Sequence, residues 1–250
     1  MTAPETLDGW FALHDLRSFD RKAWNRLPAA DRRKGVIEVT DLLTSFEEVT
    51  GAPAGRSVTY TVVGHKADFL MFHLRPEVGQ LHELERAFDG TTLASYTTRP
   101  YSYLSVTEVT RHGAPEGTAE NIEDSPFVQA RLYPEIPAHD RYICFYPMSK
   151  KREGIDNWYT LEASDRGELM RAHGRTGRRY AGKVTQIVTG SMGLDDWEWG
   201  VTLFSDDPLQ FKKLVYEMRF DDVTARFADF GTFYVGQRVL PEDLGRCLGE

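Results

Sequence analysis

The chain has 250 residues, 41% of them apolar and 27% charged, a composition typical of a folded globular protein rather than a disordered or collagen-like one. Its formal net charge of −8 disfavours nucleic acid as a general partner, because such a partner must have its phosphates neutralised. No apolar run reaches about eighteen residues, so we expect no membrane span. Two cysteines without a C-x-x-C spacing and an N-terminus without a signal-peptide pattern predict a cytoplasmic protein.

The first half of the chain predicts the order strand, helix, strand, strand, helix, strand. A strand is expected at about residues 9–16 and a helix at about 22–49, with a break near Pro28. The stretch SVTYTVVGHKADFLMFHLR predicts a hairpin that turns at Gly64. A helix over residues 76–88 follows, and the aromatic strand signal YSYLSVTEV closes this half.

The second half repeats this order at a constant offset of 132 residues. In it, Asp207 is expected to cap, and Pro208 to start, the helix that matches residues 76–88. The aligned pairs are Trp10 and Tyr142, His14 and Tyr146, Phe72 and Phe204, Pro76 and Pro208, and Phe88 and Phe220.

The order βαββαβ in each half is that of a ferredoxin-like unit. We therefore predict an α+β protein with a duplicated ferredoxin-like fold, in which two units pair their antiparallel sheets. Residues 1–118 are expected to form an N-terminal repeat without a cofactor, and residues 119–250 a C-terminal repeat that carries the functional site. A polar connector that contains Gly and Pro, residues 113–131, would join the two units.

The segment from Lys150 to Lys183 is basic, with nine Lys or Arg residues against five Asp or Glu residues. This balance favours a small polyanionic ligand, although a solvated basic helix face produces the same pattern. His173 lies on a predicted helix within the segment, with Gly174 beside it. One imidazole facing an apolar cavity suits the axial ligand of a haem iron, since the porphyrin supplies four nitrogens itself. The basic side chains would then meet the porphyrin carboxylates.

Other site motifs are not supported by the sequence. The glycines of TGSMG, residues 189–193, match neither the dinucleotide-binding nor the P-loop pattern. Ser191 has no G-x-S-x-G setting, so a serine hydrolase is poorly supported. No pair of histidines has the spacing of a metalloprotease site.

Long segments of the chain resemble the chlorite dismutase superfamily, specifically its coproheme decarboxylase branch. These segments are YPMSKKREGIDNWY, MRAHGRTGRRYAGKVTQIVTG, GLDDWEWGVTLFSDDPLQFKKLVYEMRFDDVTARF and FGTFYVG. The resemblance extends over nearly the whole chain, from GWFALHDLR to GTFYVGQ. It implies the duplicated ferredoxin-like fold and a homopentameric assembly.

The resemblance implies that His173 is the proximal iron ligand and that Gln186 is the distal residue. It implies that Tyr146 is the redox-active phenol and that Lys150 acts beside it, next to a propionate of the porphyrin. The family commonly has serine where Thr224 stands, and threonine keeps the hydroxyl group. The porphyrin-binding residues implied in this way are Arg131, Tyr146, Met148, Lys150, His173, Gln186 and Thr224.

The activity implied by the resemblance is the conversion of iron-coproporphyrin III (coproheme), which is both substrate and redox centre, into haem b. Hydrogen peroxide would oxidise the site, and a radical on Tyr146 would start the loss of carbon dioxide from two propionates. A haem-binding carrier or sensor without turnover is the alternative from another class. A chlorite dismutase-like enzyme is a further alternative, but chlorite-degrading members use arginine where Gln186 stands. An amide carries no charge to hold chlorite.

Overall fold

The computed structural model describes residues 5–49, 54–110 and 122–250. Within these ranges, no helix is both long enough and apolar enough to cross a bilayer. The predicted domain boundary between residues 118 and 119 lies outside the described residues.

The chain divides into two compact units. The first contains residues 1–136 and 236–250, and the second contains residues 137–235. Strand β11 (Tyr234–Arg238) therefore starts in the second unit and ends in the first.

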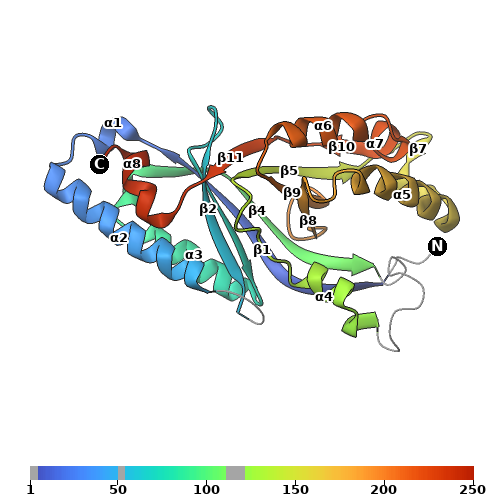
Figure 1. Ribbon diagram of the computed structural model, residues 1–250, viewed down its shortest axis with the longest axis horizontal. Helices are drawn as coiled ribbons and strands as arrows, with labels where there is room; N and C mark the ends of the chain where they lie inside the picture. The colour runs from blue at the N-terminus through green and yellow to red at the C-terminus, as the bar shows by residue number, and fades with distance from the viewer. Residues whose placement is uncertain (1–4, 50–53, 111–121) are drawn as a thin grey trace. The chain divides into compact units, whose positions relative to one another are not determined.

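The first unit has the predicted alternation of strands and helices (Figure 1). Its strands form an antiparallel sheet in the order β4-β1-β3-β2, and the end of β11 pairs with β2. The strands are β1 (Thr6–Phe19), β2 (Arg56–Val62), β3 (Phe69–Arg75) and β4 (Thr97–Thr110). The helices are α1 (Arg21–Trp24), α2 (Ala29–Glu48), α3 (Val78–Asp89), α4 (Pro126–Leu132) and α8 (Leu244–Leu248), with short 3₁₀ turns at Leu93–Tyr96, Ile122–Asp124 and Pro241–Asp243.

Local signals account for the ends of several elements. The predicted break near Pro28 is confirmed, since α1 ends at Trp24 and Pro28 precedes the first residue of α2. The predicted hairpin is also confirmed, and Gly64 in its turn has a φ of 101°, which glycine adopts without strain. Helix α4 occupies the end of the connector predicted at residues 113–131 and buries Val128. Pro126 at the start of α4 was its available signal.

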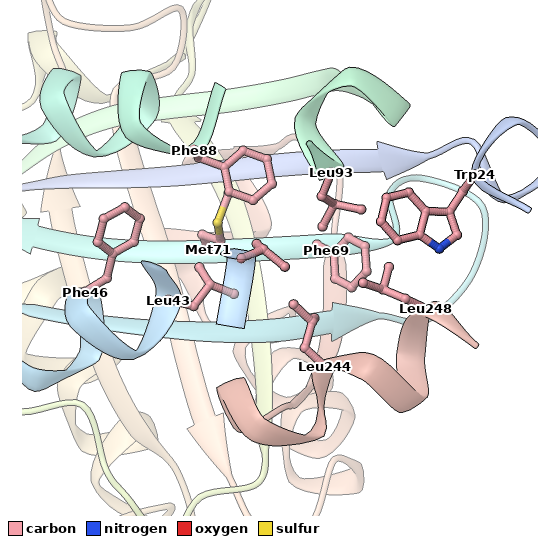
Figure 2. Close-up of a cluster of buried hydrophobic side chains, with 10 residues drawn as sticks. Trp24, Leu43, Phe46, Phe69, Met71, Phe88, Leu93, Leu244 and Leu248 are labelled. Atoms are coloured by element: carbon pink, nitrogen blue, oxygen red, sulfur yellow. The ribbon is translucent and has the colours of Figure 1, made fainter. Parts of the chain in front are cut away.

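Helices α2 and α3 cover one face of the first sheet (Figure 1). An apolar cluster joins them to β3 and to the C-terminal helix α8, as Figure 2 shows. Leu43 of α2 lies in this cluster, with only 2% of its surface exposed. The cluster consists of Trp24, Val39, Leu43, Phe46, Phe69, Met71, Phe88, Leu93, Leu244 and Leu248.

The second unit has the antiparallel strand order β10-β5-β9-β8. Its strands are β5 (Tyr142–Lys150), β8 (Thr185–Gly190), β9 (Trp199–Ser205) and β10 (Ala228–Phe230), and a small ladder pairs β6 (Arg152–Glu153) with β7 (Asp156–Asn157). Its helices are α5 (Ala163–Arg178), α6 (Leu209–Met218) and α7 (Asp222–Phe227), preceded by a 3₁₀ turn at Trp158–Thr160. The Asp207 carboxylate accepts a hydrogen bond from the Leu209 N–H group at 3.0 Å, so α6 starts one residue later than predicted.

Strand register corrects one equivalence that the 132-residue offset predicted. The offset holds for β3 and β9, so Phe69 of β3 matches Val201 of β9. Val201 pairs with Tyr146, but Phe69 pairs with Arg17 rather than with His14. His14 points to the opposite face of its sheet, where it stacks on Phe72 with ring centroids 4.5 Å apart. The structural counterpart of Tyr146 in the first unit is therefore Arg17.

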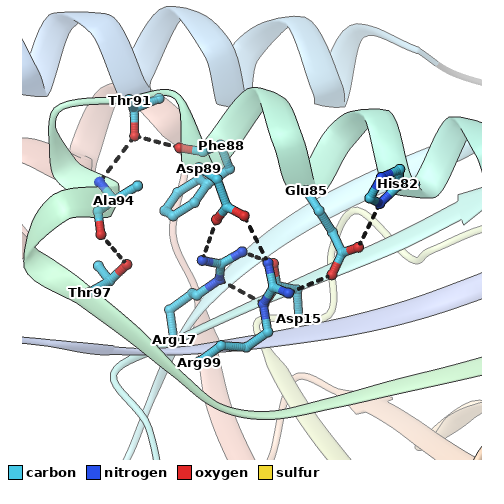
Figure 3. A network of polar contacts seen from close by, with 10 residues as sticks. All are labelled: Asp15, Arg17, His82, Glu85, Phe88, Asp89, Thr91, Ala94, Thr97 and Arg99. Carbon is cyan, nitrogen blue, oxygen red and sulfur yellow. Dashed lines mark hydrogen bonds and ion pairs between the residues drawn. The ribbon is translucent and has the colours of Figure 1, made fainter.

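Arg17 is the centre of a buried ion-pair network under α3 (Figure 3). Its guanidinium group donates two hydrogen bonds to Asp15, at 2.7 and 2.8 Å, and one to Asp89, at 2.7 Å. Burial lowers the pKa of Arg17, but the two carboxylates outweigh burial and raise it overall. Arg99 extends the network to Glu85 at 3.1 Å. The helix-facing position that holds a phenol in the second unit is thus filled by paired charges in the first.

We expect Leu43→Ala to destabilise the protein by about 2–5 kcal/mol, because it removes buried methyl groups and leaves a cavity between α2 and β3. Ile37→Ala is the matched control, since Ile37 lies on the same helix with 61% of its surface exposed. Its free energy of unfolding should change by no more than about 0.5 kcal/mol. Urea unfolding followed by circular dichroism measures both, and equal losses would contradict this assignment of the core.

Candidate functional site

The end of β5 presents three of the predicted site residues on one face of the second sheet. Tyr146, Met148 and Lys150 are two residues apart, so their side chains point the same way. Tyr146 is buried beside α6 and stacks on Phe233, with ring centroids 4.4 Å apart. Its other aromatic neighbour is Phe230, at 5.5 Å.

Burial keeps Tyr146 in its phenol form. Desolvation raises the pKa of the hydroxyl group far above its ordinary value, Cys144 adds to that effect, and the positive charge of Arg219 opposes it. The Arg219 guanidinium group lies 4.1 Å from the centroid of the Phe230 ring, next to this aromatic group. Arg219 was not predicted as a site residue, because a single arginine after a helix carries no distinctive sequence signal.

Lys150 is a half-buried cation whose ammonium group lies 4.6 Å from the centroid of the Trp158 ring. Burial lowers its pKa to about 8, while the charges of Asp221 and Glu198 act in the opposite direction. Lys150 is therefore mostly protonated at pH 7 and becomes neutral as the pH rises through about 8. A carboxylate placed beside it would find a positive charge only on the acidic side of that value.

His173 is fixed by a carboxylate. Its Nδ1 atom lies 3.0 Å from Asp221 Oδ2, and 29% of its side chain remains exposed. Its Nε2 atom makes no hydrogen bond with the described residues and is the nitrogen left for a metal ion. A carboxylate on the far nitrogen orients a metal-binding imidazole and increases its basicity. His173 could therefore serve as a single axial ligand.

Asp221 brings three predicted residues together. It caps α7, where its Oδ1 atom accepts a hydrogen bond from the Thr224 N–H group at 2.9 Å and its Oδ2 atom accepts one from the Thr224 hydroxyl at 3.5 Å. The same carboxylate contacts His173 and acts electrostatically on Lys150. Sequence analysis missed Asp221, although an acidic residue before a short helix indicates a cap.

Gln186 lies on the same side of the sheet as Tyr146. Gln186 pairs with Leu203 of β9, and Leu203 pairs with Cys144 of β5, two residues from Tyr146. Residues directly opposite in antiparallel strands share a face. From the strand spacing and the rise along the strand, the Cα atoms of Gln186 and Tyr146 are separated by roughly 12 Å.

The sheet around Gln186 is left uncovered, unlike the matching region of the first unit. Gln186 is exposed, and Val188, which shares its face, keeps 39% of its surface exposed. In the first unit the counterpart of Gln186 is Thr59, which is buried beside Val39 and Leu43 of α2. Helix α2 packs on β2, whereas α5 packs against α6 and α7. We call the exposed part of β8 formed by Gln186 and Val188 the uncovered strip.

The remaining predicted residues are divided between the units. Met148 pairs with Phe230 of β10 and packs against the apolar cluster around Tyr146. Arg131 belongs to the first unit, at the end of α4, where its guanidinium group lies 5.1 Å from the centroid of the Phe127 ring. Burial lowers the pKa of Arg131. Its participation in a site with the other six residues stays a prediction.

The side chains of the second unit fit an iron porphyrin. His173 could ligate the iron, the ammonium group of Lys150 and the hydroxyl of Thr224 could contact carboxylates, and the uncovered strip offers apolar and amide surface for a flat ring. This donor set contains one histidine and no thiolate, which suits a metal that arrives within its own ring of ligands.

Comparisons with known proteins agree with this chemistry. The profile of the chlorite dismutase family matches residues 22–239. A haem-binding protein from Thermus thermophilus is 45% identical, with a TM-score of 0.92, and the match covers 100% of both chains. A mutant chlorite dismutase from Candidatus Nitrospira defluvii is 20% identical, with 97% of both chains covered and a TM-score of 0.77. The predicted resemblance to the chlorite dismutase superfamily and the predicted duplicated ferredoxin-like α+β fold are therefore confirmed.

We expect Asp221→Asn to weaken haem b binding by about tenfold to a hundredfold, because the amide keeps the cap on α7 but removes the charge behind His173. Absorbance titration with haem b measures the affinity, and thermal unfolding checks that the cap survives. Asp222→Asn is the control, since Asp222 is the exposed next residue of the same helix. An affinity and a haem spectrum identical to those of the unaltered protein would show that Asp221 does not support an iron ligand.

Proposed function

The chain belongs to the chlorite dismutase family, and from that premise we propose that it is a coproheme decarboxylase. In this proposal it binds iron-coproporphyrin III and uses hydrogen peroxide to convert two of the four propionates into vinyl groups, which yields haem b. The observation that carries the proposal is the buried phenol of Tyr146, which shares a sheet face with the half-buried ammonium group of Lys150. A protein that only stores haem has no use for an oxidisable phenol on the sheet face that also presents a cation for a carboxylate.

The uncovered strip supports a position for the porphyrin. We propose that His173 on α5 would ligate the iron and that Gln186 would face the ring. Covering Val188 with the ring would remove apolar surface from water, at about 25 cal/mol per Å². The gain is available here because α5 does not bury this part of the sheet itself.

Recognition of a tetracarboxylate requires several cations and hydroxyl groups. Lys150, Thr224 and Arg131 are the proposed carboxylate partners, and Arg219 joins them because its charge acts on Tyr146. Hydrogen bonds from a charged donor are typically worth about 1.5–3 kcal/mol each. The basic segment of an otherwise acidic chain is explained if it neutralises these carboxylates.

The bound iron would supply the peroxide-driven oxidation, and the protein would direct it. Tyr146 remains protonated because burial raises its pKa, so it is oxidised as a phenol and loses its proton in the same step. The resulting radical takes a hydrogen atom from the β-carbon of the propionate. Loss of carbon dioxide and of one further electron then leaves the vinyl group. One propionate, one hydrogen peroxide and one proton give one vinyl group, one carbon dioxide and two waters.

Two alternatives are weaker. A chlorite-degrading enzyme would need a cation above the iron, and Gln186 is neutral. A haem carrier or sensor is favoured by the haem-binding protein from Thermus thermophilus, which is described by binding rather than by turnover. Carrier and enzyme both need His173, but only the enzyme needs the hydroxyl group of Tyr146. A cytoplasmic location and a homopentameric assembly remain parts of the proposal.

We expect Tyr146→Phe to bind coproheme almost normally but to form neither the three-propionate intermediate nor haem b when peroxide is added. The substitution keeps the ring and removes the hydroxyl group, so it should cost little stability. Mass spectrometry of the extracted porphyrin gives the result, with Tyr216→Phe on the exposed face of α6 as control. Production of haem b at the normal rate would sink the tyrosyl mechanism. Tight binding without turnover in the unaltered protein would favour the carrier.

We expect Lys150→Gln and Arg131→Gln to lower the affinity for coproheme by about tenfold to a hundredfold and to affect haem b less, because coproheme has two more carboxylates. Lys183→Gln tests whether a charge elsewhere in the basic segment has the same effect, since Lys183 is exposed. Dissociation constants for both porphyrins are measured by quenching of tryptophan fluorescence. Equal weakening for the two porphyrins would show that these cations do not read the additional carboxylates.

A further inference from the structure

We infer that Glu198 is a positioning residue that fixes the end of β5 and keeps the ammonium group of Lys150 charged for a porphyrin carboxylate. Glu198 immediately precedes β9, and neither a sequence motif nor the proposed chemistry assigns it a role. The inference rests on the proposed function only in the identity of the carboxylate. The contacts between Glu198 and the end of β5 stand independently.

The backbone of Glu198 is tied to the strand that carries the site. Its N–H group donates to the Met148 carbonyl at 3.1 Å and lies 3.2 Å from the Ser149 hydroxyl. Its carbonyl accepts a hydrogen bond from the Ser191 N–H group at 2.9 Å. The residue is therefore held between the end of β5 and the turn that follows β8.

The side chain of Glu198 is a buried carboxylate, with 7% of the residue exposed. Its Oε2 atom accepts a hydrogen bond from the backbone N–H group of Lys150 at 2.7 Å, and its Oε1 atom lies 3.8 Å from the Arg152 guanidinium group. Its negative charge also acts on the Tyr159 hydroxyl and, after burial, contributes to the raised pKa of that group. A carboxylate this deeply buried is tolerated only with several such partners.

The partners of the Glu198 N–H group and side chain all belong to residues 148–159, the segment that supplies Lys150. The Glu198 carboxylate thus interacts with the end of β5, with Arg152 of the β6–β7 ladder and with Tyr159 in the turn at Trp158. Burial lowers the pKa of Lys150 to about 8, and the negative charges of Asp221 and, next, Glu198 oppose that decrease and so increase the charged fraction of the lysine. Without the charge of Glu198, the desolvation cost would be opposed by Asp221 alone among the carboxylates that act on it.

Other charged and titratable groups surround this lysine. Asp221, at the start of α7, also raises the pKa of Lys150 but is engaged with His173. Arg152 on β6 and the Tyr159 hydroxyl both act on Glu198 rather than directly on the lysine. Removing the Glu198 carboxylate therefore changes the charge of Lys150 without removing the carboxylate that holds the His173 imidazole.

The decisive experiment titrates Lys150 in Glu198→Gln. The amide is nearly isosteric and can still accept the Lys150 N–H hydrogen bond, so it removes the charge while retaining the contact. Protein labelled with ¹³C-lysine gives one Cε–Hε signal for each lysine, and Lys150→Arg identifies the signal of interest. We expect the midpoint of its titration to move from about 8 to lower pH by about one unit.

Glu217→Gln is the matched control. Glu217 of α6 also pairs with an arginine, Arg179, and raises the pKa of a tyrosine, Tyr180, but it is not among the charges that act on Lys150. The Lys150 midpoint should not move in this variant. An unchanged midpoint in Glu198→Gln, or an equal shift in both variants, would overturn the inference. Thermal unfolding of both variants confirms that each titration reports on folded protein.

Binding of iron-coproporphyrin III over the same pH range connects the lysine to its ligand. At pH 8, Glu198→Gln should bind this porphyrin up to about tenfold more weakly than the unaltered protein, and at pH 6 the two should differ little. The difference should disappear when Lys150→Gln is present in both. The Lys150 midpoint of Glu198→Gln could shift as expected in the absence of porphyrin while neither the unaltered protein nor any variant binds porphyrin. That result would refute the proposed function and support the role of Glu198. A weakening that is the same at all pH values would refute control through the charge of Lys150.

Discussion

A helix that packs on a sheet normally buries an apolar stripe against it, and α5 departs from that arrangement. Helix α2 buries Val39, Leu43 and Phe46 against the first sheet, whereas α5 buries only Thr176 among its described residues. The rest of the site depends on this difference. Because α5 is held by α6 and α7 instead of by β8, His173 can stand away from the sheet while Val188 stays exposed. A ligand that covers this surface would stabilise the folded state in proportion to its occupancy.

Two copies of one scaffold have therefore been filled in different ways. In the first unit, Arg17 occupies the position of Tyr146 and is fully engaged by Asp15 and Asp89, so its charge is neutralised internally. In the second unit, Tyr146 is surrounded by aromatic rings, and Lys150 forms no direct ion pair with any carboxylate of the described residues. A cation that the protein does not pair itself remains available to a ligand.

Buried carboxylates give the second unit its geometry. Asp221 accepts a hydrogen bond from the Thr224 backbone N–H group and contacts His173, and Glu198 accepts one from the Lys150 backbone N–H group. Taking such groups out of water is costly, and the cost is offset only when the partners are fixed and correctly oriented. The same requirement immobilises His173 and the end of β5. The positions of the site side chains thus depend on Asp221 and Glu198, two groups that are not proposed to contact the ligand.

The sequence by itself determined the order of the elements, because Pro28 and Gly64 break and turn the chain through local backbone restrictions. Aromatic and basic residues along β5 and α5 also indicated the segments that carry the site. Tertiary structure alone decided which residues meet. The bonds of Asp221 to His173 and of Glu198 to Lys150 each span 48 residues, and no local pattern encodes a partner so far away. The replacement of His14 by Arg17 as the counterpart of Tyr146 has the same cause, since strand register is set by hydrogen bonding and packing of the whole sheet.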